Sequence, residues 1–479
     1  MSHFKGLFGW AIRYPGRNRQ FPARIPKLDC GFRLRTISSS RRTRAQYGLN
    51  NRASRVDWLG AGLSTDGGND GVKTMMRRIL PILFGLALTA SSRAQSSLEA
   101  IGQPAPETPT ITGKLEGSRV AVFKSPKDSC NQNDIPDAMA RAFRDSTGTI
   151  HFVSASSELF LSLGPTLETL QHSCHAAFQS ANDPNPADFN DQAWLDSFYT
   201  LDGKTIAALS HTEYHGWAHP GECFTPNYNE CEYDSDTYHR SQDGGYHFES
   251  FKAPANFLVG IPYKYEIDGG PMGYSVDTNV VKFNGWYYAV ATDWTWPPNC
   301  SGDKGPRRCI VPTGGAPIRT KDVFDPTSWR GWNGTDFSLT FVDPYPGPVS
   351  HPKEHIYTPV PYMFAVGGIN VYQSANLVVA TLWDYWDNEL GPPGLYLTAS
   401  TDLVHWTKPT LVVTVKELSK NDPKGSFLYA YFSLIDPNAP DLNFSIIGDH
   451  PYVYYVRLNN NNTSDRVLFR QKVELTLNQ

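Results

Sequence analysis

The chain has few charged residues, and several motifs that mark common enzyme classes are missing from it. Charged side chains make up 19% of its 479 residues, whereas aromatic side chains make up 13%. This balance argues against a disordered chain, and Ala, Glu, Lys and Leu do not dominate as they do in coiled coils. The sequence contains no Gly-x-Ser-x-Gly elbow, no phosphate-binding loop and no Cys-x-x-Cys pair. A serine hydrolase of that type, a nucleotide-binding domain and a cysteine metal site are therefore disfavoured.

Turn-forming and aromatic residues are abundant instead. The chain has 39 Gly, 36 Pro, 24 Tyr and 12 Trp, and its apolar runs are short. Such a composition favours turn-rich β structure. Helical periodicity is scarce, and the best candidate for a helix is the segment 167–177.

The first 94 residues differ from the rest in charge and pattern. Residues 1–74 carry 14 Lys or Arg and 4 Asp or Glu, with few periodic apolar positions. Residues 75–94 combine a basic start, a short apolar run and the ending Ser92-Arg93-Ala94, which are the three parts of a secretory signal peptide. We interpret 75–94 as that signal peptide and 1–74 as an upstream-start artefact or an unstructured basic extension. The alternative for 1–74 is a basic targeting or nucleic-acid-binding arm.

The part that follows, 95–479, is acidic, with 26 Lys or Arg against 43 Asp or Glu. An acidic protein has no electrostatic basis for binding nucleic acid or an anionic membrane. No further apolar run is long enough to span a bilayer. The composition predicts a linker over 95–117 and a folded domain over 118–479. We expect this domain to be a monomer that is secreted or periplasmic.

Six cysteines follow the predicted cleavage site, and an even number fits an oxidising compartment. Two pairs of them bracket short loops rich in Pro, Asn and Gly, so local pairing is the simplest expectation, although six cysteines allow 15 connectivities. The expected disulfides are Cys223–Cys231, Cys300–Cys309 and Cys130–Cys174.

β-rich units recur along the predicted domain. A unit has two strands around a small polar turn, and several units close with Ser/Thr-x-Asp followed by an aromatic residue. Five such units fit the blades of a propeller, in which radial repetition avoids exposed sheet edges. A pair of β-sandwiches is the alternative. The strand pairs are expected within residues 140–153, 195–209, 278–290, 362–380 and 432–456.

Two of the closing segments carry a family resemblance. Ser241-x-Asp243-x-Gly245-x-x-Phe248 resembles the Asp-box of sialidase-type propellers. Residues 400–406, Ser-Thr-Asp-Leu-Val-His-Trp, resemble the blade ending of five-bladed glycosidases of the arabinanase, xylosidase and invertase groups. The resemblance implies an all-β, five-bladed propeller and a carbohydrate-active function. The motif itself marks the outer turn of a blade and carries no catalytic group.

Ligands of propellers usually bind at one mouth of the central funnel, so polar residues near the start of an innermost strand are candidates for catalysis. Asp134 and Asp137 precede the first predicted strand and Arg141 begins it, in a stretch that loosely resembles the Asn-Asp-Pro motif of the invertase group. A glycosidase needs a proton donor and a base or nucleophile across the scissile bond. We expect Asp137 or Asp134 to be the base or nucleophile and Arg141 to bind substrate. The alternative for each aspartate is a structural turn residue.

A second cluster lies after the apolar strand of the second unit. His211, Glu213 and His215 share one face of this strand because side chains alternate along it. A carboxylate between two imidazoles, with Trp217 nearby, suits Glu213 as proton donor, with His211, His215 and Trp217 binding substrate. Two alternatives stay open, a metal site at the histidines and a structural loop held by the Cys223–Cys231 disulfide.

Two further aspartates and one tryptophan complete the predicted site. Asp268 lies on a glycine-rich loop and Asp277 follows it. By resemblance to the xylosidase group, Asp277 or Asp268 is expected to be an auxiliary acid that tunes the proton donor. We assign this role to Asp277 and expect Asp268 to contact substrate. The xylosidase group carries its acid glutamate in a later blade than the one that would contain Glu213. At this point the sequence departs from the pattern of that group. Trp194 is expected to stack on a sugar, although aromatic side chains more often fill the space between blades.

The sequence thus predicts a secreted glycoside hydrolase that uses paired carboxylates, with carbohydrate as its ligand and no cofactor. The alternatives are a non-catalytic propeller that binds glycan or protein, and a metal-dependent hydrolase at His211 and His215. Whether the reaction retains or inverts configuration depends on the separation of the carboxylates.

Overall fold

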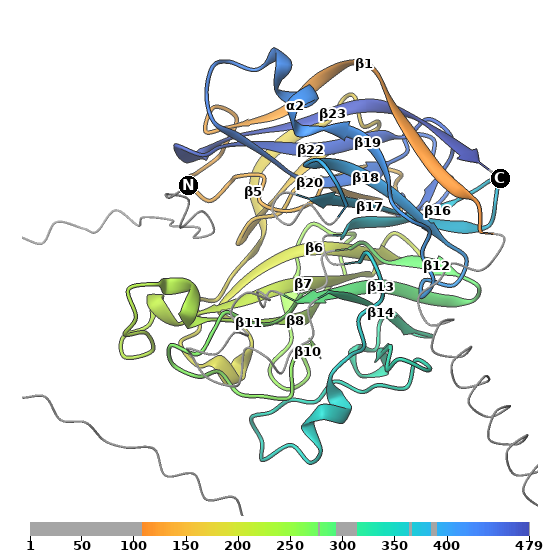
Figure 1. The fold of residues 1–479 in the computed structure, drawn as a ribbon. Helices are drawn as coiled ribbons and strands as arrows, with labels where there is room; N and C mark the ends of the chain where they lie inside the picture. The colour runs from red at the N-terminus through yellow and green to blue at the C-terminus, as the bar shows by residue number, and fades with distance from the viewer. Residues whose placement is uncertain (1–107, 276–277, 294–313, 364–365, 385–389, 479) are drawn as a thin grey trace, which may run out of the picture. The chain divides into compact units, whose positions relative to one another are not determined.

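The computed structural model describes residues 108–275, 278–293, 314–363, 366–384 and 390–478, and they form almost only β-strands (Figure 1). Among these residues the one α-helix is the single turn α2 (Val415–Leu418), and no helix is long and apolar enough to cross a membrane. The predicted basic extension and signal peptide lie outside the described residues. Short 3₁₀ turns are η1 (Pro186–Asp188), η2 (Gly216–Ala218), η3 (Tyr228–Cys231), η6 (Pro326–Ser328), η7 (Pro352–His355) and η8 (Ser419–Asn421).

The strands form four hydrogen-bonded sheets that follow one another along the chain. The first contains β2 (Arg141–Arg144), β3 (Ile150–Val153), β4 (Glu158–Gly164) and β5 (Gln171–Gln179). The second contains β6 (Gln192–Thr200), β7 (Ile206–His215), β8 (Glu232–Ser241), β9 (Glu249–Ser250), β10 (Phe257–Val259), β11 (Met272–Ser275), β12 (Val281–Phe283), β13 (Trp286–Asp293), β14 (Gly315–Thr320) and β15 (Arg330–Gly331). The third contains β16 (Val366–Tyr372), β17 (Leu377–Asp384), β18 (Gly394–Ser400), β19 (Thr410–Thr414) and β21 (Ile446–Ile447). The fourth contains β20 (Phe427–Ile435), β22 (Tyr452–Asn459), β23 (Asn462–Asn478) and β1 (Thr110–Ser125).

The large second sheet consists of two antiparallel groups. β6, β7 and β8 pair in sequence, and β13 pairs with β12, β11 and β14. The two groups are joined where β11 runs parallel to β8, with Met272 opposite Tyr233. Consecutive strands that pair in antiparallel fashion are what the repeated two-strand units of the sequence predict.

The two ends of the described chain meet in the fourth sheet. β1 runs antiparallel to β23, from Thr110 opposite Asn478 to Ser125 opposite Arg466 (Figure 1, orange beside violet). The first and last described strands thus pair with each other in one sheet, and the main-chain groups along this side of each strand are hydrogen-bonded. β1 begins at Thr110, so it starts inside the segment expected to be a linker and before the domain boundary expected at residue 118.

The first strands of successive sheets meet through side-chain to main-chain hydrogen bonds. Ser433 on β20 donates to the carbonyl of Ala140, just before β2, at 3.0 Å. Arg141 on β2 donates to the carbonyl of Asp196 on β6 at 2.8 Å. These bonds place strands from the fourth, first and second sheets next to one another, and they satisfy carbonyls that are buried at this junction.

Apolar side chains fill the spaces between neighbouring sheets. Phe143 on β2 and Phe198 on β6, for example, have ring centroids 5.4 Å apart and are nearly inaccessible to solvent. Trp329 and Trp406 are fully buried, in keeping with the expectation that most aromatic side chains belong to the core. Several such clusters, rather than one central core, connect the sheets.

The helix considered for 167–177 was a wrong prediction. Gln171–Gln179 forms β5, which pairs with β4, and Leu167 is buried in the turn between them. The apolar spacing in this segment comes from a hairpin, and strand pairing has overridden the local helical pattern. Two predicted disulfides are present, Cys130–Cys174 and Cys223–Cys231, while Cys300 and Cys309 lie outside the described residues.

Candidate active site

The predicted His211, Glu213 and His215 do share one face of β7. Their partners on the neighbouring strand β8 are acidic, because the antiparallel register places Asp236 opposite His211, Asp234 opposite Glu213 and Glu232 opposite His215. Directly opposite residues have side chains on the same face of the sheet. The end of this hairpin therefore carries a two-by-three block of ionisable side chains.

Glu213 is the centre of this block. His215 Nε2 lies 2.5 Å from its Oε2 and His211 Nε2 lies 3.5 Å from its Oε1, and its side chain is 18% exposed. Burial alone would raise the pKa of Glu213, but the bond to His215 and the charges of both histidines outweigh burial and lower it. Glu213 is therefore an ionised carboxylate at neutral pH.

Glu232 and Asp234 have the opposite electrostatic character. Burial, followed by the charges of Glu213 and Asp234, holds the pKa of Glu232 well above its usual range. Asp234 is fully buried, and burial raises its pKa to about 6, although His211, whose Nε2 is 3.9 Å from Oδ1, opposes the rise. Neighbouring carboxyls whose pKa values are pushed apart are the usual basis of an acid and base pair.

Asp137 is held by two side chains from the fourth sheet. Arg466 Nη1 lies 2.5 Å from its Oδ1, and the hydroxyl of Tyr431 donates to the same oxygen at 3.0 Å. Burial raises the pKa of Asp137 and the Glu213 charge adds to the rise, whereas Arg466 and the hydrogen bonds oppose it. Because a buried guanidinium would lose its counter-charge if Asp137 were protonated, we treat Asp137 as the carboxylate.

Tyr431 reaches Asp137 through an irregularity in its strand. The register between β20 and β22 shifts between Ala430 and Ser433, and Tyr431 has a positive φ of 61°. A bulge of this kind turns one side chain out of the regular alternation, and such features are frequent beside active sites. Burial and the charge of Asp137 raise the pKa of Tyr431 well above 10, so its hydroxyl stays a hydrogen-bond donor.

The two predicted carboxylates, Asp137 and Glu213, lie within electrostatic range of each other. The charge of Glu213 acts on both Asp137 and Tyr431, which belong to the chain segments before β2 and on β20. The site therefore combines the first, second and fourth sheets. Its ionisable members are the carboxyls of Asp137, Glu213, Glu232 and Asp234, the guanidinium of Arg466 and the imidazoles of His211 and His215.

Aromatic rings border the histidine side of the site. The Trp217 ring stacks on the His215 ring with centroids 4.0 Å apart, and Trp217 is half-buried. Trp194 lies about equally far from His211 and His215, at 6.0 and 6.1 Å, and is 8% exposed. Trp217 thus offers a ring edge to a ligand, whereas Trp194 supports the histidines from the core side.

Arg141 binds main-chain carbonyls where the sheets meet. Its guanidinium donates to the main-chain carbonyls of Ala140, Asp196 and Gly367, and the side chain is almost fully buried. These bonds join β2 to β6 and to the start of β16. The expected role in substrate binding gains no support from this placement.

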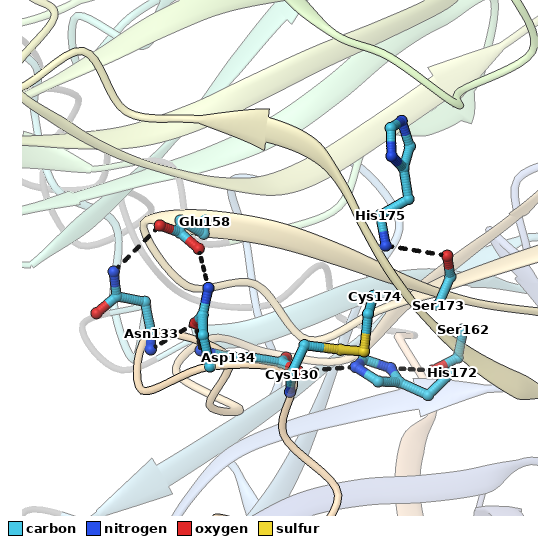
Figure 2. Close-up of a disulfide and its surroundings, with 10 residues drawn as sticks. Cys130, Asn133, Asp134, Glu158, Ser162, His172, Ser173, Cys174 and His175 are labelled. Carbon is cyan, nitrogen blue, oxygen red and sulfur yellow. Dashed lines mark hydrogen bonds and ion pairs between the residues drawn. A yellow bond between two sulfur atoms is a disulfide. The ribbon is translucent and has the colours of Figure 1, made fainter.

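Asp134 lies in a different cluster from Asp137 (Figure 2). Its Oδ2 accepts a hydrogen bond from the main-chain N–H of Cys130 at 2.7 Å and lies 2.8 Å from His172 Nε2. His172 in turn contacts the hydroxyl of Ser162, beside the Cys130–Cys174 disulfide. These contacts fit the structural turn role that is the alternative for Asp134, and Asp137 stays the candidate base.

Asp268 does not join the carboxyl cluster. Asp268 Oδ1 accepts hydrogen bonds from the main-chain N–H groups of Phe224 and Thr225, so it holds the loop closed by Cys223–Cys231. That loop leads directly into Glu232, which makes Asp268 a supporting residue. Asp277 lies outside the described residues.

Sequence reasoning missed the acidic strand and the cation of the site. The run Glu232-x-Asp234-x-Asp236 alternates acids in the way that β7 alternates its polar residues, and this signal was available in the sequence. Arg466 and Tyr431 come from the last quarter of the chain and have no local pattern that links them to Asp137.

A metal site at the histidines of β7 is one alternative for this cluster. Within the described ranges, three ligand side chains lie close enough for one ion at two places, namely Cys130 with Asp134 and His172, and Cys223 with Cys231 and Asp268. Both places include cysteines that form disulfides. Because a metal binds the free thiolate, neither place offers a complete ligand set.

The chain is similar to known proteins in its architecture and not in its sequence. No protein-family model matches the chain, and no curated protein matches it. The chain resembles glycosidase-like propellers. Among solved structures, a glycoside hydrolase has 10% identity and a TM-score of 0.39 over 80% of this chain and 94% of its own. The α-L-arabinanase of Cellvibrio cellulosa has 9% identity and a TM-score of 0.37 over 69% and 89%, respectively. The sialidase of Trypanosoma rangeli has 8% identity and a TM-score of 0.35 over 75% and 59%.

Proposed function

We propose that this chain is a secreted five-bladed β-propeller that hydrolyses glycosidic bonds at the Asp137–Glu213–Glu232 cluster. The division of the second sheet into two antiparallel groups supports five blades, since three of the four sheets supply one blade each and this one supplies two. The shared sheet of β1 and β23 is the closure that a ring of blades needs. The two disulfides fit an exported protein.

The observation that carries the proposed chemistry is the contact of His215 Nε2 with Glu213 Oε2 at 2.5 Å, which lowers the pKa of Glu213 while burial and the Glu213 charge raise that of Glu232. Glu213 is ionised because His215 and His211 surround it, and its charge helps to keep Glu232 protonated. A glycosidase needs a protonated carboxyl on the leaving-group side of the bond and an ionised one on the other side. We therefore revise the expected roles, with Glu232 as proton donor and Glu213 as the carboxylate that tunes it. The lowered pKa of Glu213 does not suit a proton donor.

Asp137 supplies the second carboxylate. Glu232 transfers its proton to the glycosidic oxygen as the bond to the anomeric carbon breaks, and the leaving group departs as an alcohol. Asp137 either takes a proton from an attacking water or attacks the anomeric carbon itself, according to the space between the carboxyls. Tyr431 and Arg466 hold Asp137 in place and favour its ionised form.

The substrate that fits this site best is a neutral saccharide. Four carboxyls gather in the cluster, whereas its one permanent cation among the described residues, Arg466, is already paired with Asp137. An anionic sugar would have to approach ionised Asp137 and Glu213 without a free arginine from the cluster. The half-buried ring of Trp217, stacked on His215, offers an apolar edge to a sugar ring.

A panel of aryl glycosides and polysaccharides tests this function. We expect hydrolysis of at least one neutral substrate, a loss of about 10²- to 10⁴-fold in kcat for Glu232→Gln, and a comparable loss for Asp137→Asn. Glu249→Gln is the matched control, because Glu249 is an exposed glutamate on β9 of the same sheet. Binding of saccharides without hydrolysis would instead indicate a non-catalytic glycan-binding propeller.

A further inference from the structure

Two histidines from different sheets meet at the surface, outside the carboxyl cluster. His175 lies on β5 of the first sheet and His247 in the turn that follows β8 of the second. Their Nε2 atoms are 3.0 Å apart, and the ring planes stand at 84° to each other. Both side chains are exposed to solvent. The pair is therefore accessible to a small ligand that prefers imidazole nitrogen.

The other ring nitrogen of His247, Nδ1, is hydrogen-bonded to the carboxylate of Asp243. His247 Nδ1 lies 2.6 Å from Asp243 Oδ2, and Asp243 is acceptor-only in its ionised form, so the Nδ1 atom carries the proton. The lone pair of neutral His247 is then on Nε2, which faces His175. A carboxylate behind the imidazole is the arrangement that orients most metal-binding histidines.

The main chain holds both histidines in position. Asp243 Oδ1 accepts hydrogen bonds from the main-chain N–H groups of Tyr246 and His247, which closes the turn. The next residue, Phe248, is buried and donates its N–H to the carbonyl of Ala177 on β5 at 2.9 Å. The turn is thus fixed to the strand that carries His175, and the two imidazoles do not depend on flexible loops to meet.

The strand itself separates this pair from the disulfide cluster. His172 and Cys174 point to one side of β5, whereas His175 points away from them (Figure 2). The Cys130–Cys174 disulfide anchors the strand immediately before His175. The histidine pair is therefore separate from the cluster that contains Asp134.

The distance between the two nitrogens is one that two imidazoles on a shared metal ion also have. With ring centroids 5.2 Å apart the two Nε2 atoms now face each other, so the exposed rings tilt when both lone pairs turn toward an ion. Zn²⁺–N bonds are about 2.0–2.1 Å, so two imidazoles on one ion have nitrogens about 2.9–3.4 Å apart for angles between square and tetrahedral. From this geometry we propose that His175 and His247 bind a divalent transition metal, with Zn²⁺ as the reference ion and water in the remaining positions. Asp243 is a positioning residue that orients His247. The bound ion links the first sheet to the second.

A second turn in the same chain provides an internal comparison. Asp402 accepts main-chain hydrogen bonds from Val404 and His405, and His405 Nδ1 lies 2.7 Å from Asp402 Oδ2. Among the described residues, no imidazole is in ring contact or hydrogen-bonded with His405. The turn and its aspartate–histidine pair are therefore not sufficient, and the distinguishing feature of the proposed site is His175.

Calorimetric titration of the full chain, free of any histidine tag, with ZnSO₄ at pH 7.5 tests the proposal. We expect one ion per chain, at least a tenfold loss of affinity in His175→Ala and in His247→Ala, and about a tenfold loss in Asp243→Asn. His405→Ala is the matched control and should bind as the parent chain does. The histidine variants should unfold at the parent temperature without metal, because both side chains are exposed, and lose the upward shift that Zn²⁺ gives the parent.

Electron paramagnetic resonance of the Cu²⁺-loaded chain gives an independent readout, since coupling to two imidazole nitrogens should fall to one in either histidine variant. The proposal is overturned if the parent binds no Zn²⁺ or Cu²⁺, which would leave the two rings as a simple hydrogen-bonded pair. It is also overturned if binding persists in His247→Ala and disappears in His211→Ala, which would move the metal to β7.

Discussion

Glu213 and Glu232 lie on adjacent strands, and the charge of the first raises the pKa of the second. His215, 2.5 Å from Glu213, fixes this asymmetry because it favours the ionised form of Glu213. The register of β7 and β8 sets which carboxyl faces which histidine, and that register decides which glutamate keeps its proton.

Removing the charge of Glu213 should move the pH dependence of the reaction. In Glu213→Gln the pKa of Glu232 falls, so the proton donor ionises at a lower pH. The basic limb of the kcat/KM profile, where the donor is lost, should therefore shift to lower pH, with lower activity at neutral pH. Profiles of parent and variant on one substrate measure this shift. An unchanged basic limb would show that Glu213 does not act on the donor.

Asp234 should make the protein less stable as the pH rises. Its folded pKa of about 6 lies above the ordinary value of 3.8, so the folded state holds this proton more tightly than the unfolded state. The stability linked to this group is present at low pH and is lost as the pH rises through about 6. Asp234→Asn should then stabilise the chain at pH 7.5 relative to pH 4 by on the order of 2 kcal/mol.

Urea unfolding of the parent and Asp234→Asn at both pH values checks this prediction. Glu249→Gln serves as control for the loss of one carboxyl from the same sheet. If Asp234→Asn is equally destabilising at pH 4 and pH 7.5, its effect is one of packing and the raised pKa plays no part.

Arg466 and Asp137 should depend on each other for their contribution to stability. Arg466→Met leaves the Asp137 carboxyl buried without its counter-charge, which typically lowers the free energy of unfolding by about 3–5 kcal/mol. The double variant Arg466→Met/Asp137→Asn should recover part of that loss, because no buried charge remains. Chemical denaturation of Arg466→Met, Asp137→Asn and the double variant gives a double-mutant cycle for the free energy of unfolding. Additive effects would mean that the 2.5 Å contact carries no coupling.

The Cys130–Cys174 disulfide should support the fold without affecting the chemistry. Its neighbours are Asp134 and His172, and none of them contacts Glu213 or Asp137 in the described part of the chain. Replacing both cysteines with serine should lower the free energy of unfolding by about 2–5 kcal/mol and leave kcat within about twofold of the parent below the unfolding transition. A large fall in kcat at full folding would contradict the separation of the two clusters.

The sequence contained enough to predict the β architecture and half of the site. Alternation along β7 placed His211, Glu213 and His215 on one face, and this is confirmed by their contacts. Alternation works because it is a local property of the extended chain. Two of the three cysteine pairs were also predictable. Cys223–Cys231 brackets a short loop, and Cys130–Cys174 is the pair left over once both local pairs are assigned.

The missing half depends on long-range geometry. Glu232 and Asp234 join the site through the register of β7 with β8, which is set across the intervening loop that Asp268 and Cys223–Cys231 hold. Arg466 reaches Asp137 only after β1, β22 and β23 have assembled. Asp134 and Asp137 looked equivalent in the sequence because their different partners, His172 and Arg466, are remote along the chain.

The proton-donor role of Glu232 is tested most directly by the dependence of Glu232→Gln on the leaving group. A dinitrophenyl glycoside needs little protonation, whereas an alkyl glycoside of the same sugar needs it fully. We expect Glu232→Gln to lose about 10²- to 10⁴-fold in kcat/KM on the alkyl glycoside and less than about tenfold on the dinitrophenyl glycoside. Equal losses on both substrates, or the selective loss in Glu213→Gln instead, would contradict the account.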